Sequence, residues 1–198
     1  MNMNQFQNQS VPCVSLLDAM RSCEQMPGLS VLAHGEMVAE RYSELVGFLR
    51  DGKPLTSEWR LPDWIHDPII LTRLLPDDLM AEYHVFHDCG KPACLVIDEE
   101  GKRRFPNHAQ VSKDIWLSLG GDERVGELIG MDMDAHLLRD EGLAEFAARP
   151  QAIPLLLTAL AEISSNAEMF GGIESTSFKI KAKALAKRGK AVLKRIAA

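Results

Sequence analysis

The segment from His87 to Pro92 holds the densest group of chemically capable side chains in the sequence. His87 and Asp88 are adjacent, and Lys91 follows three residues later. An imidazole and a carboxylate together suit Mn, Fe, Co, Ni or Zn better than Ca or Mg. A lysine beside such an ion can offset the negative charge of a phosphate. The segment therefore indicates a transition-metal site with phosphate chemistry.

Further metal-capable side chains lie at long intervals on both sides of this segment: His34, His108, Asp132, His136 and Glu162. Asp132 and His136 are four residues apart, a spacing that places both on one face of a helix. Glu162 stands in an apolar stretch, where a buried ionised carboxylate without a partner costs several kcal/mol. A bound ion would explain Glu162, and so would a tilt of the side chain toward solvent.

A second His-Asp pair, His66-Asp67, is the weaker candidate for metal binding. Asp67 precedes Pro68, and an aspartate before a proline is typical of the first turn of a helix. We therefore interpret Asp67 as a helix cap and expect His87-Asp88 to be the metal pair.

The elements that must position these residues are mostly helical. Apolar spacing predicts helices over residues 31–49, 79–87, 111–119, 125–138 and 150–170, followed by a basic C-terminal helix. The first of these begins after Ser30 as its N-cap and ends before Gly52. Residues 94–97 and 103–105 flank a polar turn and predict one small β-hairpin. The expected fold class is all-α with this one hairpin.

Length and composition favour one domain. A chain of 198 residues, 46% hydrophobic, can bury one core. We expect a disordered tail over residues 1–11, which are rich in Asn and Gln, and a single domain over residues 12–198. The tail does not have the pattern of a secretory signal, and the apolar stretches are shorter than a bilayer span. A cytoplasmic protein with no membrane partner is therefore expected.

The charge is distributed unevenly along the chain. The net charge is -6, yet residues 179–198 contain eight of the 22 basic residues and no acid. A basic segment on an acidic body often marks a phosphate-rich partner, although a solvated helix face is an equal alternative. Hydroxyls and lysines at the start of this helix could hold a phosphate, or the hydroxyls could be ordinary caps. The candidate phosphate-binding residues are Ser175, Ser177, Lys179, Lys181 and Lys183.

These residues and their order resemble the HD superfamily of metal-dependent phosphohydrolases over residues 30–170. In that family a histidine on an early helix, a His-Asp pair and a late aspartate bind the first metal. His34, His87 and Asp88 match the first three positions, and Glu162 stands where the family usually has aspartate. The contexts Gly-Lys-Pro after the pair and Phe-Pro-Asn around His108 also match. The resemblance implies an HD-like helical bundle.

The resemblance also implies which residues bind metal and what they do. His34, His87, Asp88 and Glu162 would hold one divalent transition metal. Asp88, His108 and Asp132 would hold a second, with His136 as a further metal or substrate ligand. Asp88 and Lys91 would be catalytic, and the metals would activate water for attack on phosphorus.

The substrate is suggested by a narrower resemblance. The residues from Met169 to Lys183, together with Asp132-Met-Asp-Ala-His, resemble the HD module of bacterial RNA end-healing enzymes. Those enzymes remove 2′-phosphates and open 2′,3′-cyclic phosphates, and they carry a P-loop kinase, of which this chain has no motif. A phosphorylated nucleotide or RNA end is therefore the expected partner. The alternatives are a mononucleotide or dNTP phosphohydrolase, and a metal-free nucleotide-binding regulatory domain.

Overall fold

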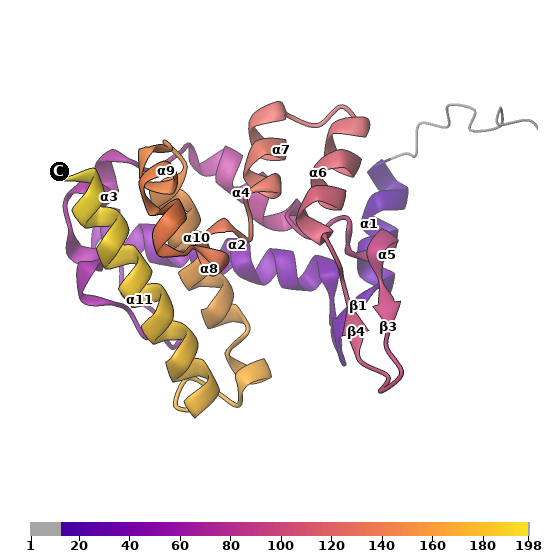
Figure 1. Cartoon of the computed structure of the whole chain (residues 1–198). Coiled ribbons are helices and arrows are strands. Elements are labelled where there is room, and N and C mark those ends of the chain that lie inside the picture. Colours follow the sequence, from indigo (N-terminus) through magenta and orange to yellow (C-terminus); the bar gives the residue numbers. More distant parts are fainter. Residues whose placement is uncertain (1–12, 198) are drawn as a thin grey trace, which may run out of the picture.

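The chain folds mainly into helices, as seen in a computed structural model that describes residues 13–197 (Figure 1). The tail predicted to be disordered, residues 1–11, lies outside the described residues. The α-helices are α1 Cys13–Ser22, α2 Val31–Asp51, α3 Ile69–Thr72, α4 Asp77–Phe86, α5 Lys91–Cys94, α6 His108–Ser118, α7 Glu123–Gly130, α8 Asp134–Leu137, α9 Leu143–Ala148, α10 Ala152–Ser165 and α11 Thr176–Ile196. Short 3-10 helices are η1 Asp63–His66, η2 Asp140–Gly142 and η3 Ala167–Phe170. The expected helical class is confirmed.

Two small antiparallel hairpins accompany the helices. Strands β3 Val96–Ile97 and β4 Arg103–Arg104 form the hairpin that the sequence predicts. Strands β1 Glu24–Met26 and β2 Leu29–Ser30 form another, so the expectation of only one hairpin was wrong. These strands are too short to show an alternating pattern. Their turn depends on Gly28, whose φ of 79° is accessible to glycine at little cost.

Helix α10 forms the centre of the fold, and all of its residues are buried. It packs against α2, α8, α9 and α11, while α2 also packs against α4. A helix that is apolar on every side is stable only when it is covered on every side. No helix within residues 13–197 combines the length and apolar character needed to cross a membrane.

The predicted caps of α2 are present where the sequence places them. The Ser30 hydroxyl accepts a hydrogen bond from the backbone N–H of Ala33, and Gly52 ends α2 in the left-handed conformation. The N-cap position of α3 is held by Pro68, one residue after the predicted Asp67, but the Asp67 carboxylate still accepts from the N–H of Ile69 at the start of α3. Asp67 is therefore engaged in local structure.

One expected helix is broken. Residues 125–138 were predicted to be continuous, but α7 ends at Gly130 and α8 begins at Asp134. The intervening turn carries Asp132, whose carboxylate is buried and accepts a hydrogen bond from Tyr83. This long-range contact is invisible in local spacing. Asp132 and His136 therefore do not share one face of a single helix.

The expected helix over residues 150–170 also ends early. Helix α10 ends at Ser165, and η3 follows after Asn166. The basic helix α11 begins after Ser175, whose hydroxyl accepts from the N–H of Phe178. Figure 1 shows α11 along the outside of the molecule. It packs against α9 and η1.

The buried side chains form two apolar clusters. The larger joins α2, α4, α7, α10 and α11. The smaller surrounds α1 and includes Met20, Leu32 and Cys89. Leu32 and Cys89 are close neighbours in sequence of His34 and Asp88, so the predicted metal ligands lie where the two clusters meet.

Candidate metal centre

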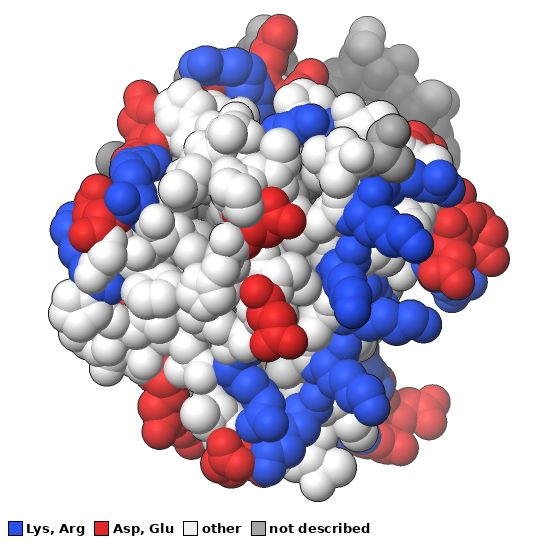
Figure 2. Space-filling model, turned by 90° about the vertical axis from the view of Figure 1, so that its left-hand side faces the viewer, with Lys and Arg blue, Asp and Glu red and all other residues white. Residues whose placement is uncertain are grey.

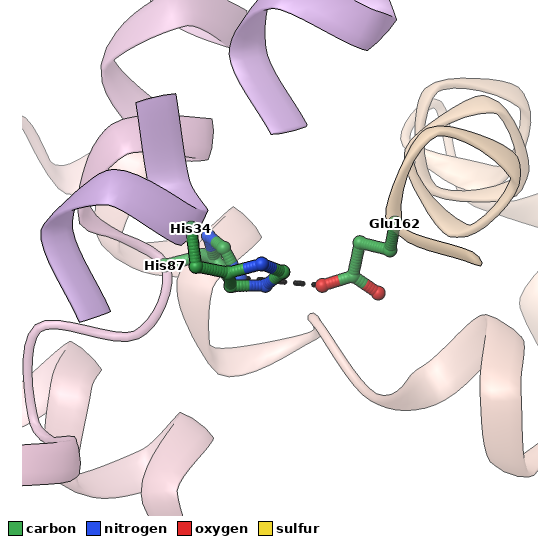
Figure 3. Close-up of side chains that lie close together, drawn as sticks. All are labelled: His34, His87 and Glu162. Carbon is green, nitrogen blue, oxygen red and sulfur yellow. Dashed lines mark ion pairs between the residues drawn. The ribbon is translucent and has the colours of Figure 1, made fainter. Parts of the chain in front are cut away.

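Five of the predicted ligands come from separate places in the chain and are all buried: His34 from the first turn of α2, His87 and Asp88 from just after α4, Asp132 from the turn after α7, and Glu162 from α10. In Figure 3, His34 and His87 lie together on one side, and Glu162 points toward them from the opposite side. The fold therefore gathers residues that are as much as 128 positions apart.

Two glycines allow the elements that carry these ligands to approach closely. A Cβ on Gly35 would lie 2.4 Å from the carbonyl oxygen of Val85, so glycine lets α2 contact α4 directly. A Cβ on Gly90 would lie 2.4 Å from the backbone nitrogen of Ser112 on α6. Both approaches are closer than any larger residue permits. They set the separations between His34, His87 and the start of α6.

The ligand atoms lie within reach of common ions. His87 Nε2 is 3.2 Å from Asp88 Oδ2 and 3.2 Å from Glu162 Oε1. His34 Nε2 is 3.8 Å from Asp88 Oδ2. Ligand atoms lie within 4.8 Å of one another in two groups of three, His34 with His87 and Glu162, and His87 with Asp88 and Asp132. Two ligands about 2 Å from one ion can be at most about 4 Å apart, so both groups are close to the required spacing.

His108 contacts the cluster more loosely. Its Nε2 lies 3.7 Å from Asp88 Oδ1, and its side chain is partly exposed. Within the described residues it belongs to no group of three ligand atoms that lie within 4.8 Å of one another. The structure thus brings His108 to Asp88, but it places Asp132 with His87 instead of with His108.

Hydrogen bonds on the outer side of the ligands fix their orientation. The carbonyl oxygens of His84 and Phe105 can only accept, so His87 Nδ1 donates to His84 at 2.6 Å and His108 Nδ1 donates to Phe105 at 3.0 Å. Both rings therefore present Nε2 to the cluster. The Tyr83 hydroxyl donates to Asp132 Oδ1 at 2.7 Å. Such partners orient ligands and set their protonation in metal sites.

Three buried polar atoms at the centre have no hydrogen-bond partner among the described residues. They are His34 Nδ1, His87 Nε2 and Asp88 Oδ1. Buried polar atoms are nearly always hydrogen-bonded, since an unpaired one costs about 1–3 kcal/mol. A cation would satisfy His87 Nε2 and Asp88 Oδ1 together. The residues present therefore fit a metal ion.

The charges of the cluster lead to the same conclusion. Burial, reinforced by Glu162, raises the pKa of Asp132 to about 7. Burial also opposes the charged form of His87, but the carboxylates of Asp88, Asp132 and Glu162 outweigh it and raise the pKa of His87 well above its usual range. Three carboxylates buried this close together repel one another strongly. A divalent cation would relieve that repulsion.

Lys91 lies inside the centre beside Asp88. Its Nζ is 2.5 Å from Asp88 Oδ2 and 2.7 Å from Gln25 Oε1. Gln25 belongs to β1, the hairpin that the sequence does not reveal. The ammonium group thus neutralises Asp88 and also lines the cavity above the cluster.

His136 contacts a different acid from the one expected. It lies on α8 and its Nε2 hydrogen-bonds to Glu162 Oε2, whereas the spacing predicted a pair with Asp132. Burial works against the charged imidazole, but the hydrogen bond to Glu162 outweighs it and raises the pKa of His136. Glu162 is therefore held between His87 and His136.

A cavity of about 520 Å³ opens above the cluster. Its floor includes His34, Asp88, Asp132 and Glu162, with Lys91 and His108 beside them. Its remaining wall is partly cationic and partly apolar, and is lined by Lys181, Arg188, Met133, Leu137, Ile163, Phe170, Ile180 and Leu185. A polar floor beneath an apolar wall is typical of a small-molecule site.

The predicted phosphate-binding residues are only partly brought to this cavity. Lys181 lines it, with its Nζ 4.9 Å from the centre of the Phe170 ring. Ser175 caps α11, and Lys179 pairs with Glu174 at 2.8 Å. Ser177 and Lys183 are exposed and do not line the cavity.

Sequence reasoning missed several residues at the site. Arg188 and Asn166 line the cavity, Gln25 binds Lys91, and Tyr83 holds Asp132. The basic run 179–195 gave a signal for Arg188, but no spacing singled it out. Gln25 and Tyr83 act through contacts between distant segments and had no signal, and no pattern singled out Asn166.

Comparison with known proteins adds no assignment. No family model, no curated protein and no solved structure matches this chain. The site must therefore be interpreted from its own residues.

Proposed function

We propose that the protein is a metal-dependent phosphohydrolase of the HD type that removes phosphate from phosphomonoesters. The observation that carries this proposal is the buried set of His34, His87, Asp88, Asp132 and Glu162 at the floor of a cavity that also exposes Lys91. Imidazole and carboxylate ligands favour Mn, Fe, Co, Ni or Zn. His34, His87 and Asp88 match in type and chain order the ligands of the HD superfamily. Glu162 would take the place of the late aspartate, and Asp132 stands where two-metal members commonly carry histidines.

The ligands divide between one or two ions. His34, His87, Asp88 and Glu162 would hold the first. Asp88 and Asp132 would hold the second, together with His108, whose Nε2 lies 3.7 Å from Asp88 Oδ1. A bound divalent ion supplies Lewis acidity toward a phosphoryl oxygen and makes water acidic enough to react near neutral pH.

The chain's own cations would position the substrate. Lys91 and Lys181 both line the cavity, and Arg188, which also lines it, lies further along α11. Together they would neutralise the phosphoryl oxygens and the departing alkoxide, most strongly at Lys91, which is buried. His136 and Tyr83 would keep Glu162 and Asp132 in place by hydrogen bonds.

The apolar part of the wall supports a nucleotide as the substrate. Phe170, Leu137 and Ile180 line the same cavity as the metal ligands and could pack against a sugar and base. We propose 2′-phosphate and 2′,3′-cyclic phosphate ends of RNA or nucleotides as the substrates. The same wall also suits a mononucleotide or a deoxynucleoside triphosphate, which is the second candidate. A metal-free regulatory domain is the third.

A phosphatase screen separates these candidates. Purified protein would be assayed with Mn, Co, Ni, Cu or Mg against p-nitrophenyl phosphate, nucleoside 2′- and 3′-monophosphates, 2′,3′-cyclic nucleotides and triphosphates. Metal-dependent release of phosphate from the 2′-monophosphate and 2′,3′-cyclic substrates supports the proposal. Preference for triphosphates supports the second candidate. Purified protein without bound metal or activity would leave the regulatory domain.

A further inference from the structure

A second, smaller groove of about 190 Å³ adjoins the metal cavity along α11. It lies between that helix and the segment from the end of α8 into α9. Its lining consists of Leu138, Arg139, Asp140, Leu143, Ala184, Lys187, Arg188 and Ala191. Ala184 and Arg188 line both the groove and the metal cavity. The two hollows are therefore neighbours on one continuous surface.

The groove is predominantly cationic. Arg139, Lys187 and Arg188 line it against a single acid, Asp140. Within residues 13–197 none of these three cations has a carboxylate oxygen within 4.0 Å. Arg188 is fixed by a 3.0 Å hydrogen bond from its Nε to the carbonyl of Leu138. A fixed guanidinium with its other N–H groups uncommitted is well suited to a phosphate.

The surface of α11 is open enough and long enough to contact several successive phosphates of a nucleic-acid backbone. Ala184 and Ala191 flank Arg188 along α11, and their small side chains leave the groove open. Lys181, at the metal cavity, and Arg188 are separated by about 10 Å of helix. That distance corresponds to about three stacked nucleotides at roughly 3.4 Å each. Figure 2 shows basic side chains gathered in a row on the side of the molecule where α11 lies.

Exposed apolar side chains stand at the mouth of the metal cavity. Leu137 is 65% exposed and Ile180 is 64% exposed, although both line the cavity. Exposed apolar side chains beside a binding cavity often contact a ligand. Here Leu137 and Ile180 offer apolar surfaces against which nucleotide bases could pack. Inorganic polyphosphate has no bases and would gain nothing from them.

We propose that the groove binds the phosphodiester backbone of a single-stranded nucleic acid whose phosphorylated end lies in the metal cavity. This inference rests on the proposed function and narrows its substrate from nucleotides in general to oligonucleotides. It assigns the backbone contacts to Arg139, Lys187 and Arg188, and not to the basic helix as a whole.

The chain supplies a matched control. Lys190 and Lys194 are exposed on α11 and line neither hollow. The double variants Arg139→Gln/Lys187→Gln and Lys190→Gln/Lys194→Gln remove the same charge from the same region. None of these four residues contacts the proposed metal ligands, so neither variant should alter the hydrolysis of p-nitrophenyl phosphate.

Binding can be measured without hydrolysis. Fluorescence anisotropy of an eight-nucleotide RNA with a 2′-phosphate at its 3′ end and a label at its 5′ end would be followed from low to moderate salt, without added metal. The groove variant should bind about tenfold more weakly. Its slope of log affinity against log salt should become less negative by about 1.4, because two cations are removed and each phosphate contact on a single strand contributes about 0.7. The control variant should bind within twofold of the parent.

Each other result has a definite meaning. Equally weakened RNA binding in both double variants would overturn the assignment of binding to the groove, and would mean that the RNA contacts the basic surface of α11 as a whole. An unlabelled polyphosphate of equal charge that competes as well as the RNA would overturn the nucleic-acid assignment. Loss of p-nitrophenyl phosphate hydrolysis in the groove variant would also overturn it. Groove-dependent RNA binding in a parent that hydrolyses no phosphomonoester with any metal would instead remove the proposed function and keep the groove.

Discussion

His87 and Glu162 meet at 3.2 Å between Nε2 and Oε1, although 75 positions separate them in the chain. Glu162 is on α10, which is buried on every side, and its second oxygen is bonded to His136. His87 in turn is oriented by the carbonyl of His84. The glutamate thus reaches the same imidazole that the His-Asp pair presents. In the proposed HD-type site, this carboxylate would take the place of the family's late aspartate.

The first prediction concerns the His-Asp pair. His87→Ala and Asp88→Ala should each lower metal-dependent phosphate release by about 100-fold or more, because several kcal/mol of charge stabilisation would depend on the ion. Far-ultraviolet circular dichroism should show that the helices remain. His66→Ala is the control, since His66 lies on η1 beside Phe48 and outside the cavity. Activity within threefold of the parent in both variants would refute the metal site.

The number of ions is the second prediction. His108→Ala should lower the metal content, measured by elemental analysis, by about one ion per chain. Among the described residues, His108 contacts the proposed ligands through Asp88 and belongs to no ligand group of its own, so its loss would leave the His34, His87 and Glu162 group intact. An unchanged metal content would support a single ion, with His108 free to contact the substrate.

Local sequence patterns predict where His34 and the His87-Asp88 pair lie on their own helices. The Ser30 cap fixes where α2 begins, and His34 therefore lies in its first turn. The His87-Asp88 pair follows α4 directly, as its spacing indicates. The convergence of these residues with Glu162 was expected only from a family resemblance, because spacing alone cannot bring distant helices together.

Contacts between distant segments account for what the sequence did not reveal. Gln25 reaches Lys91 from a hairpin whose strands have two or three residues, too few for a periodic signal. Tyr83 donates a hydrogen bond to Asp132 across 49 positions, and Asp132 lies at a break where a continuous helix was expected. In neither pair does the local sequence around one residue indicate its partner. Such polar contacts are set by packing, which the hydrophobic pattern constrains only coarsely.

Removal of the Tyr83 hydroxyl provides the third prediction. Tyr83→Phe should lower the free energy of unfolding by about 1–3 kcal/mol, because it leaves the buried Asp132 carboxylate without its donor. Tyr42→Phe is the matched control. The Tyr42 hydroxyl is also buried but has no partner among the described residues, so its loss should cost less than about 0.5 kcal/mol. Urea unfolding at pH 8 measures both, and equal losses would contradict the assignment.

Glu44 organises the loop that follows α2. Its Oε1 accepts from the backbone N–H groups of Thr56 and Ser57 and from the Thr56 hydroxyl, while its Oε2 accepts from Trp59 Nε1 at 2.9 Å. In the same loop, the backbone carbonyl of Glu58 accepts a hydrogen bond from the hydroxyl of Ser164 on α10. The carboxylate of Glu44 therefore helps to fix this loop against the helix that carries Glu162.

The fourth prediction is a pH dependence of stability that arises from Glu44. Burial acts to raise its pKa, but the four hydrogen bonds outweigh it and lower the pKa from 4.5 to about 2. In the unfolded chain the group takes up a proton near pH 4.5, whereas in the folded protein it does so only near pH 2. The stabilisation is therefore complete above pH 4.5 and is lost as the pH falls toward 2.

Glu44→Gln should accordingly lower the free energy of unfolding by about 1–3 kcal/mol at pH 7, since the amide keeps the shape but loses the charge that strengthens the hydrogen bonds. The difference from the parent should shrink steadily in urea titrations at pH 7, 5, 4 and 3, because the parent loses its advantage as the unfolded carboxylate becomes protonated. Glu40→Gln, exposed on the same helix, should show little difference at any pH. If the difference in the free energy of unfolding between Glu44→Gln and the parent stays constant from pH 7 to pH 3, the loop depends on the shape of the Glu44 side chain and not on its charge.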